Sequence, residues 1–147
     1  MKFTLTSSIL FATSALAIPA NVQRDNTLQI TEFRASTSII DSASMHFVVT
    51  DANYPDDTPT ECNLLWTYGN SPEARARCNN SQYYIRFPDG RVDFNSFTLE
   101  LERVSGPIAE KGQAKLNSKN SPWKCVKDPK EGIELQCEYD GVLTMKV

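Results

Sequence analysis

Histidine is nearly absent from this sequence, which contains a single one, His46. A serine or cysteine hydrolase needs a histidine as general base, oriented by a carboxylate and placed beside the nucleophile. His46 falls on the polar side of an expected strand, and no cysteine is expected to be free to pair with it. The sequence therefore predicts no catalytic residues.

Zinc-binding motifs are missing as well. The four cysteines contain no CxxC, and the one histidine lies far from them along the chain. Structural zinc sites are built from closely spaced cysteine and histidine ligands. We expect neither a metal site nor a cofactor.

Long apolar runs are also missing. The most apolar stretch spans about residues 9–16, which is too short to cross a bilayer, since a spanning helix takes roughly 20 residues. Lys2 precedes this stretch, and the small-x-small pattern of residues 15–17 follows it. This combination predicts a signal peptide over residues 1–17 and no membrane span.

The mature chain is expected to be secreted and extracellular. Cleavage after Ala17 is the first expectation, with a site near Ala20 or after Arg24 as alternatives. Residues 18–26 then form a flexible N-terminal tail, and residues 27–147 form a single domain. About 130 residues suffice for one real hydrophobic core.

A large excess of charge of either sign is absent too. Lysine and arginine number 15 against 18 acidic residues, which gives a net charge of −3. Proteins that bind nucleic acids generally have a strongly basic balance, so no nucleic acid is expected as a partner. Lysines gather in one stretch of the chain. Either they form a patch for anionic wall polymers or lipid head groups, or they belong to a solvated loop and strand edge, and we favour the second interpretation. These lysines are Lys111, Lys115, Lys119, Lys124, Lys127 and Lys130.

The cysteines of a secreted chain predict disulfides. Their number is even, as expected in an oxidising compartment. Four cysteines allow three pairings, and the sequence alone does not choose among them. Their clustering along the chain favours Cys62–Cys78 and Cys125–Cys137.

Period-two alternation of apolar and polar residues dominates the mature chain. In residues 96–104, for example, Phe97, Leu99 and Leu101 share one side of the expected strand. A sheet with one buried face requires this alternation. Strands are expected near residues 27–34, 44–50, 61–68, 82–87, 92–94, 96–104, 112–117, 132–139 and 142–147.

Turn sequences separate these strands. Residues 88–90 (PDG) predict a bulged turn, and residues 140–141 (DG) predict a two-residue hairpin between the last two strands. One short helix is expected over residues 71–77, with Pro72 in its first turn. Many short antiparallel strands in one small domain predict an all-β fold, a small antiparallel β-barrel or sandwich with two intrachain disulfides.

Large amphipathic side chains anchor a partner where they are exposed. We expect Tyr84 and Trp123 to be exposed, because Tyr84 opposes the apolar face of its strand and Trp123 follows a proline in a loop. With Lys124 and Lys127, they are the predicted partner-binding residues. Asn79 begins an Asn-Asn-Ser sequon, which predicts N-glycosylation.

Three short motifs of the chain recur in a known group of secreted proteins. They are residues 28–33 (LQITEF), the pair Cys62 and Cys78 around an aromatic-rich strand, and the pair Cys125 and Cys137 before a final apolar strand. On these motifs the chain resembles the secreted fungal β-barrel family typified by the major allergen of Alternaria alternata, which includes plant-defence elicitors.

The resemblance implies a small β-barrel, a disulfide within each cysteine pair, a role at the fungus–host interface and no established catalytic site. The allergen has an extra cysteine upstream of its first strand that links two subunits, whereas residues 21–28 contain none. A covalent dimer is therefore not expected, and a non-covalent homodimer stays open.

Three functions remain. The expected one is a non-catalytic effector or elicitor that binds a host extracellular protein or receptor. One alternative is a barrel that carries a small apolar or phenolic ligand. The other is a secreted hydrolase such as a ribonuclease, in which His46 would join Glu100 or Glu102 and Arg86 or Arg103 around a phosphate.

We predict that the secreted protein begins at Ile18, directly after the small residue that signal peptidase requires. N-terminal sequencing of protein from culture medium tests this. Ala17→Tyr should block cleavage there, whereas Thr4→Tyr, near the N-terminus, should leave it unchanged. A secreted chain that retains residues 1–17 would contradict the prediction.

Overall fold

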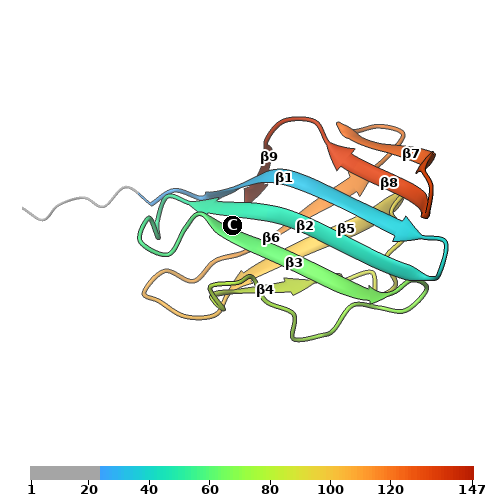
Figure 1. Cartoon of the computed structure of the whole chain (residues 1–147). Helices are drawn as coiled ribbons and strands as arrows, with labels where there is room; N and C mark the ends of the chain where they lie inside the picture. Colours follow the sequence, from blue (N-terminus) through green and yellow to red (C-terminus); the bar gives the residue numbers. More distant parts are fainter. Residues whose placement is uncertain (1–23) are drawn as a thin grey trace, which may run out of the picture.

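The computed structural model of the chain describes residues 24–147 (Figure 1). The expected signal peptide over residues 1–17, its cleavage after Ala17 and the tail up to residue 23 lie outside the described residues. Within residues 24–147, no helix has the length and apolar character needed to cross a membrane.

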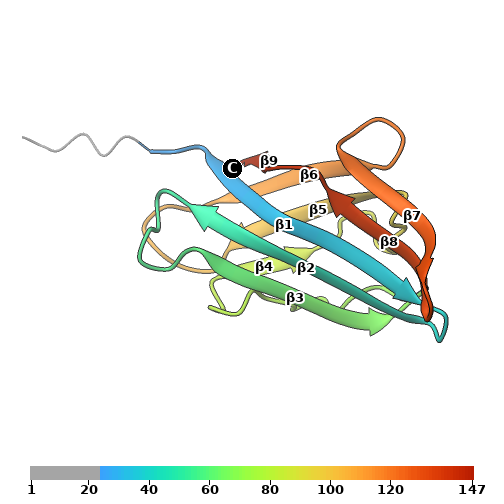
Figure 2. The ribbon, with the colours of Figure 1, turned by 45° about the horizontal axis from the view of Figure 1, so that its top comes forward.

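The described residues form two antiparallel β-sheets packed face to face (Figures 1 and 2). The larger sheet has six strands in the order β3-β2-β1-β8-β7, with β9 also paired to β1, and the smaller has the order β4-β5-β6. The expected all-β fold is confirmed as a sandwich, and these two sheets do not close into a barrel. The strands are β1 (Thr27–Ser38), β2 (Ser42–Asp51), β3 (Thr60–Thr67), β4 (Tyr83–Arg86), β5 (Ser96–Arg103), β6 (Lys111–Asn117), β7 (Trp123–Lys130), β8 (Ile133–Tyr139) and β9 (Leu143–Lys146).

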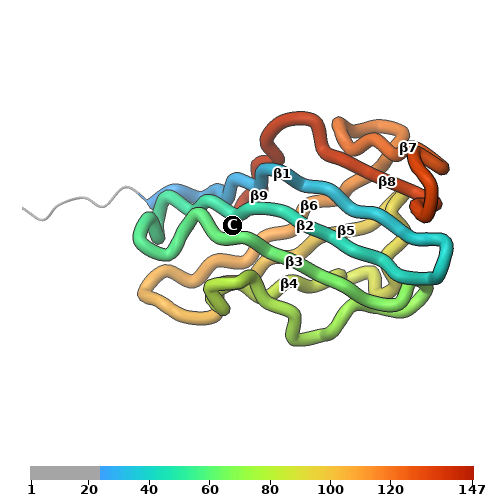
Figure 3. Tube along the Cα trace, viewed as in Figure 1, coloured from blue at the N-terminus to red at the C-terminus, as the bar shows by residue number. Residues whose placement is uncertain are grey.

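Strand β1 organises the larger sheet because its two halves have different partners. On one side it pairs with β2 along nearly its whole length. On the other side, residues 27–30 pair with β9 and residues 34–38 pair with β8. Figure 2 shows β9 and β8 beside successive parts of β1, and the tube in Figure 3 traces the connection between them.

A β-bulge lies where β1 changes partner. Between Thr31 and Arg34, β1 contains one more residue than the stretch of β2 that faces it. Glu32 has a φ of 52° there, in the left-handed region. The extra residue turns Phe33 into the core and leaves Glu32 on the outside.

The two sheets are joined along both sides of the sandwich. On one side β6 contacts β9, where a Cβ on Gly112 would collide with the carbonyl oxygen of Lys146 and lie 2.9 Å from the Met145 side chain. Glycine is therefore required at this crossing. On the other side, Cys62 in β3 is bonded to Cys78, just before β4.

Both expected disulfides, Cys62–Cys78 and Cys125–Cys137, are confirmed, with sequence separations of 16 and 12. Cys125 and Cys137 face each other directly across β7 and β8. A closed loop of about 15 residues contributes roughly 3 kcal/mol of stability in the chain-entropy account.

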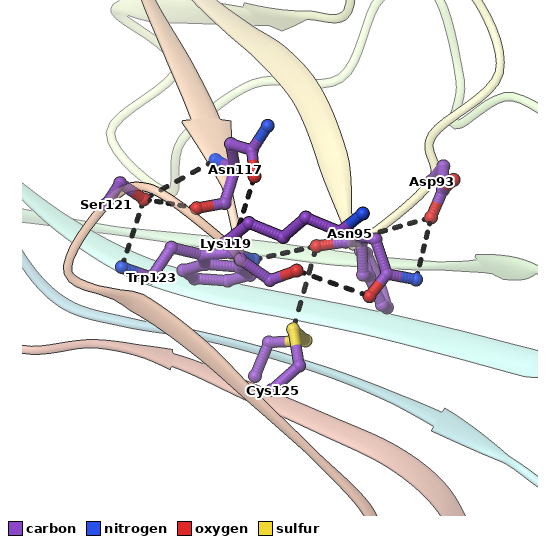
Figure 4. Close-up of a disulfide and its surroundings, with 10 residues drawn as sticks. Asp93, Asn95, Asn117, Lys119, Ser121, Trp123 and Cys125 are labelled. Carbon is purple, nitrogen blue, oxygen red and sulfur yellow. Dashed lines mark hydrogen bonds between the residues drawn. A yellow bond between two sulfur atoms is a disulfide. The ribbon is translucent and has the colours of Figure 1, made fainter.

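Aromatic rings fill the space between the sheets. Trp123 is 0% exposed, and its ring centroid lies 4.8 Å from that of Phe33 and 5.6 Å from that of Phe97. Its Nε1–H donates to the carbonyl oxygen of Phe94 at 2.8 Å (Figure 4). The prediction that Trp123 is an exposed binding residue is wrong, because it begins β7 with its side chain directed inward.

The expected helix at residues 71–77 is also wrong. Only the end of this segment lies beside β4, where Ile85 N–H donates to the carbonyl of Ala76 at 2.9 Å and Arg77 bridges to Tyr84. A helix of two turns has little stability of its own. Residues 73–76 form a single turn instead, in which Ala76 N–H donates to the carbonyl of Glu73 at 3.1 Å.

Residues 92–94, expected as a strand, form an irregular segment between β4 and β5. Val92 and Phe94 are buried, and Asp93 makes an isolated bridge to Ser96. The apolar residues alternate here as in a strand, but the segment that buries them forms a turn and does not pair as a β-strand.

Two further differences concern the C-terminal third. The two-residue hairpin expected at residues 140–141 is wrong: Gly141 has a φ of 91°, but β8 and β9 both pair with β1 and not with each other. Strand β7 was not predicted, since most of its residues are exposed and it contains Pro129. Proline is tolerated on an edge strand, because its missing N–H faces solvent.

We predict that Trp123→Ala lowers the free energy of unfolding by about 3–5 kcal/mol, because it leaves a cavity among the rings and removes a buried hydrogen bond. Chemical denaturation measures this. Leu65→Ala is the control, since Leu65 is 79% exposed and should change stability by less than about 0.5 kcal/mol. Equal effects of the two substitutions would contradict the packing described here.

Candidate functional site

The outer face of the six-stranded sheet carries a row of uncharged polar side chains between two apolar ones. The strand register places Leu65, Ser44, Ser36, Gln136 and Val126 side by side across β3, β2, β1, β8 and β7. The two serine hydroxyls lie 3.0 Å apart. At the ends of the row, Leu65 is 79% and Val126 59% exposed.

The neighbouring row on the same face is polar and charged. It consists of Asn63, His46, Arg34, Glu138 and Lys124, again in register from β3 to β7. Nδ1 of His46 lies 2.7 Å from Oδ1 of Asn63, and because that oxygen can only accept, Nδ1 carries the proton. This hydrogen bond orients the imidazole ring, and Nε2 is the ring nitrogen that remains for a second interaction.

A depression of about 400 Å³ lies over these two rows. Both serines line it, as do Asn63, His46 and Arg34 of the polar row. Lys130 and Ile133, from the hairpin between β7 and β8, contribute to its wall. Side chains that line it offer hydrogen-bond donors and acceptors, two cations and an imidazole: Arg34, Ser36, Ser44, His46, Asn63, Lys130 and Gln136.

The bulge in β1 adds a carboxylate to this site. It places Oε2 of Glu32 3.5 Å from Nε2 of His46. The Glu32 side chain is 65% exposed, whereas that of His46 is only 16% exposed. Nε2 itself is screened from solvent and makes no hydrogen bond. Bulges commonly re-aim side chains beside functional sites, and this one directs an acid at the chain's one histidine.

The predicted partner-binding residues do not form one surface. Tyr84 is half-buried on the smaller sheet, where Arg77 and Arg86 lie over its ring at 4.4 and 4.7 Å from the centroid. Lys124 and Lys127 are exposed on β7, in the other sheet. Lys124 belongs to the polar row described above, and Lys127 does not.

The ribonuclease grouping considered from the sequence is not assembled either. His46 lies on the outer face of the larger sheet, whereas Glu100, Glu102 and Arg86 form an ion-pair network on the smaller sheet. The Arg103 side chain is buried, with 4% exposure. The acid and the arginine nearest to His46 in the sheet are Glu32 and Arg34, and both come from β1.

Sequence reasoning missed most of this site. Outward alternation along each expected strand could have selected Ser44, His46 and Asn63. Their alignment with β1 and β8 depends on inter-strand register, which no local pattern contains. Among residues 24–147, no group of three or more His, Cys, Asp or Glu side chains is arranged to hold a metal ion.

Comparison with protein-family models, with curated proteins and with solved structures found no match to this chain.

The glycosylation prediction concerns an exposed turn. Asn79 is exposed directly after Cys78, and its backbone N–H donates to the carbonyl of Glu61 at 2.7 Å.

We predict one N-glycan at Asn79, which Asn79→Gln should remove as a single loss of glycan mass. Asn120→Gln, at an exposed asparagine outside any sequon, is the control and should leave the mass pattern unchanged. A secreted wild-type protein of unmodified mass would contradict the prediction.

Proposed function

We propose that the chain is a secreted, non-catalytic protein that binds a host extracellular protein or receptor through the outer face of its larger sheet. The observation that carries the proposal is the depression of about 400 Å³ over Ser36 and Ser44, with the exposed Leu65 and Val126 at either end of its row. Two disulfides support an extracellular location.

The chemistry of the face suits a protein partner. Partner-binding surfaces combine apolar contacts with hydrogen-bonding groups, and no excess of one charge is needed. Here Arg34 and Lys130 are balanced by Glu32 and Glu138 on the same sheet. The face belongs to paired strands, so binding would cost little ordering of the backbone. The host as source of the partner rests on the resemblance to the fungal allergen and elicitor family alone.

The alternative of a small-ligand carrier has less support. The interior between the sheets is filled by fully buried side chains rather than by a ligand cavity. A carried compound would have to use a surface cleft of about 320 Å³ beside β4. Its apolar lining comes from Pro72, Ala74, Ile85, Phe87 and Pro88.

A second candidate function, acid–base cleavage of a phosphodiester, is favoured by one observation. Glu32 lies 3.5 Å from His46, and Arg34 is the register neighbour of His46 at the depression; these are the residue types of a base, an acid and a phosphate-binding cation. Glu32 would take the proton of the 2′-hydroxyl that attacks phosphorus, and His46 would protonate the leaving 5′-oxygen. Because Nε2 of His46 is screened, Glu32 would first have to move aside. For this reason we rank binding above catalysis.

The binding proposal predicts that Ser44→Arg reduces the response of leaf tissue to the purified mature protein by at least about tenfold, because an arginine fills the depression at an interface centre. Dose–response curves of cell death or immune output measure this. Thr98→Arg, on the outer face of the smaller sheet, is the matched control and should behave as wild type.

Full activity of Ser44→Arg would exclude this face as the site. No response to wild-type protein, together with tight binding to fungal wall, would overturn the host-binding proposal. RNA cleavage by the wild type that is lost in His46→Gln would establish the second candidate instead.

A further inference from the structure

A buried polar cluster joins the two sheets at the end of the molecule where β2 ends and β6 begins. Asp51 closes β2 and is 1% exposed, and Glu110, directly before β6, is 3% exposed. One residue holds both carboxyl groups, since Asn53 donates its backbone N–H to Asp51 and its side-chain amide to Glu110. Two buried carboxylates this close cannot both be ionised at low cost.

Every carboxyl oxygen of the pair except one has a donor. Oδ1 of Asp51 accepts from the backbone N–H of Asn53 at 2.8 Å, and Oδ2 accepts from the hydroxyl of Tyr83 at 2.6 Å. Oε1 of Glu110 accepts from Nδ2 of Asn53 at 2.6 Å. Oε2 of Glu110 is buried and makes no hydrogen bond, which leaves it as the oxygen of the pair that is available to carry a proton.

We propose that Asp51 and Glu110 share one proton that clasps the two sheets together, and that this end of the sandwich loosens when the proton is lost. In the clasped state Asp51 is the anion, with two donors of its own, and Glu110 is the neutral acid that donates to it. Loss of the proton places two charges in a site built for one.

The charged groups around the pair are consistent with this assignment. Arg103 of β5 donates to the Tyr83 hydroxyl at 3.1 Å, but its guanidinium is already paired with Asp57. The remaining charged groups near Glu110 are engaged elsewhere: Asp25 accepts from Thr27, Arg24 donates to the carbonyl of Ala109, and Lys111 pairs with Glu100 on the outer face.

The segments held by the clasp are two loops and the N-terminal end of the domain. Asn53 bridges Glu110 to the backbone carbonyl of Asp25 at 2.6 Å. The loop before Glu110 is also held by Tyr54, whose hydroxyl donates to the carbonyl of Ile108 at 2.7 Å. Gly106 lies against the same ring, where a Cβ would come within 2.5 Å of the tyrosine oxygen.

The pH range in which the clasp acts follows from Glu110. Burial, the hydrogen bond with Asp51 and its charge raise the pKa of Glu110 to about 7. The folded protein therefore binds a proton that the unfolded chain releases at its ordinary pKa of about 4.5. The stabilisation is complete below about pH 4.5, declines as the pH rises, and is lost above about pH 7.

Thermal unfolding across this pH range tests the proposal. The melting temperature of wild type should fall by at least about 5 °C between about pH 5 and pH 8. Glu110→Gln should remove that fall, because its amide donates to Asp51 without titrating, and at about pH 8 it should melt above wild type. Glu102→Gln, at a half-buried acid paired with Arg86 on the smaller sheet, is the matched control and should keep the wild-type slope.

Parallel pH profiles for wild type and Glu110→Gln would overturn the proposal. Should that variant fail to fold, the carboxyl ¹³C resonance of Glu110 in the wild-type protein decides. A titration midpoint near 7 supports the shared proton, and a midpoint near 4.5 refutes it.

Discussion

The bulge in β1 is the feature on which both faces of the larger sheet depend. One extra residue between Thr31 and Arg34 reverses the alternation of the strand, so that Phe33 enters the aromatic core. The same residue lets β1 pass from β9 to β8 as its partner. On the outside, it places the carboxylate of Glu32 beside His46, which lines the depression. Removing the bulge would therefore disturb the core, the sheet order and the candidate site together.

Three connections of different chemistry hold the sheets in place around that core. The Cys62–Cys78 disulfide joins one side, and the β6–β9 crossing at Gly112 joins the other. At one end the shared proton of Asp51 and Glu110 would add a third connection, one that responds to pH. The outer face of the larger sheet lies apart from all three. Loosening of the clasped end would thus alter loops and the N-terminal segment before it altered the proposed binding face.

Local sequence patterns predicted the fold well where a single requirement, such as burial of one side of a strand, determined the residue types. Alternation located β5 and β8 because each strand buries one side, and the clustered cysteines indicated both disulfides. The same reasoning failed for Trp123, whose burial depends on where β7 packs rather than on the proline before it. It also missed the bulge, although the switch of apolar residues from Ile30 to Phe33 is a break in parity that the sequence contains.

The candidate site was the least predictable part, because its residues come from five strands. The sequence by itself determined the all-β class and the outward side of most strands, and it favoured the local cysteine pairs, since these depend on spacing between near neighbours. Only the tertiary structure decided that Leu65 and Val126 would end one row, and that Asp51 and Glu110 would meet across the sheets. Those meetings depend on inter-strand register and sheet packing, which are set by how the core side chains fit together and not by any single segment.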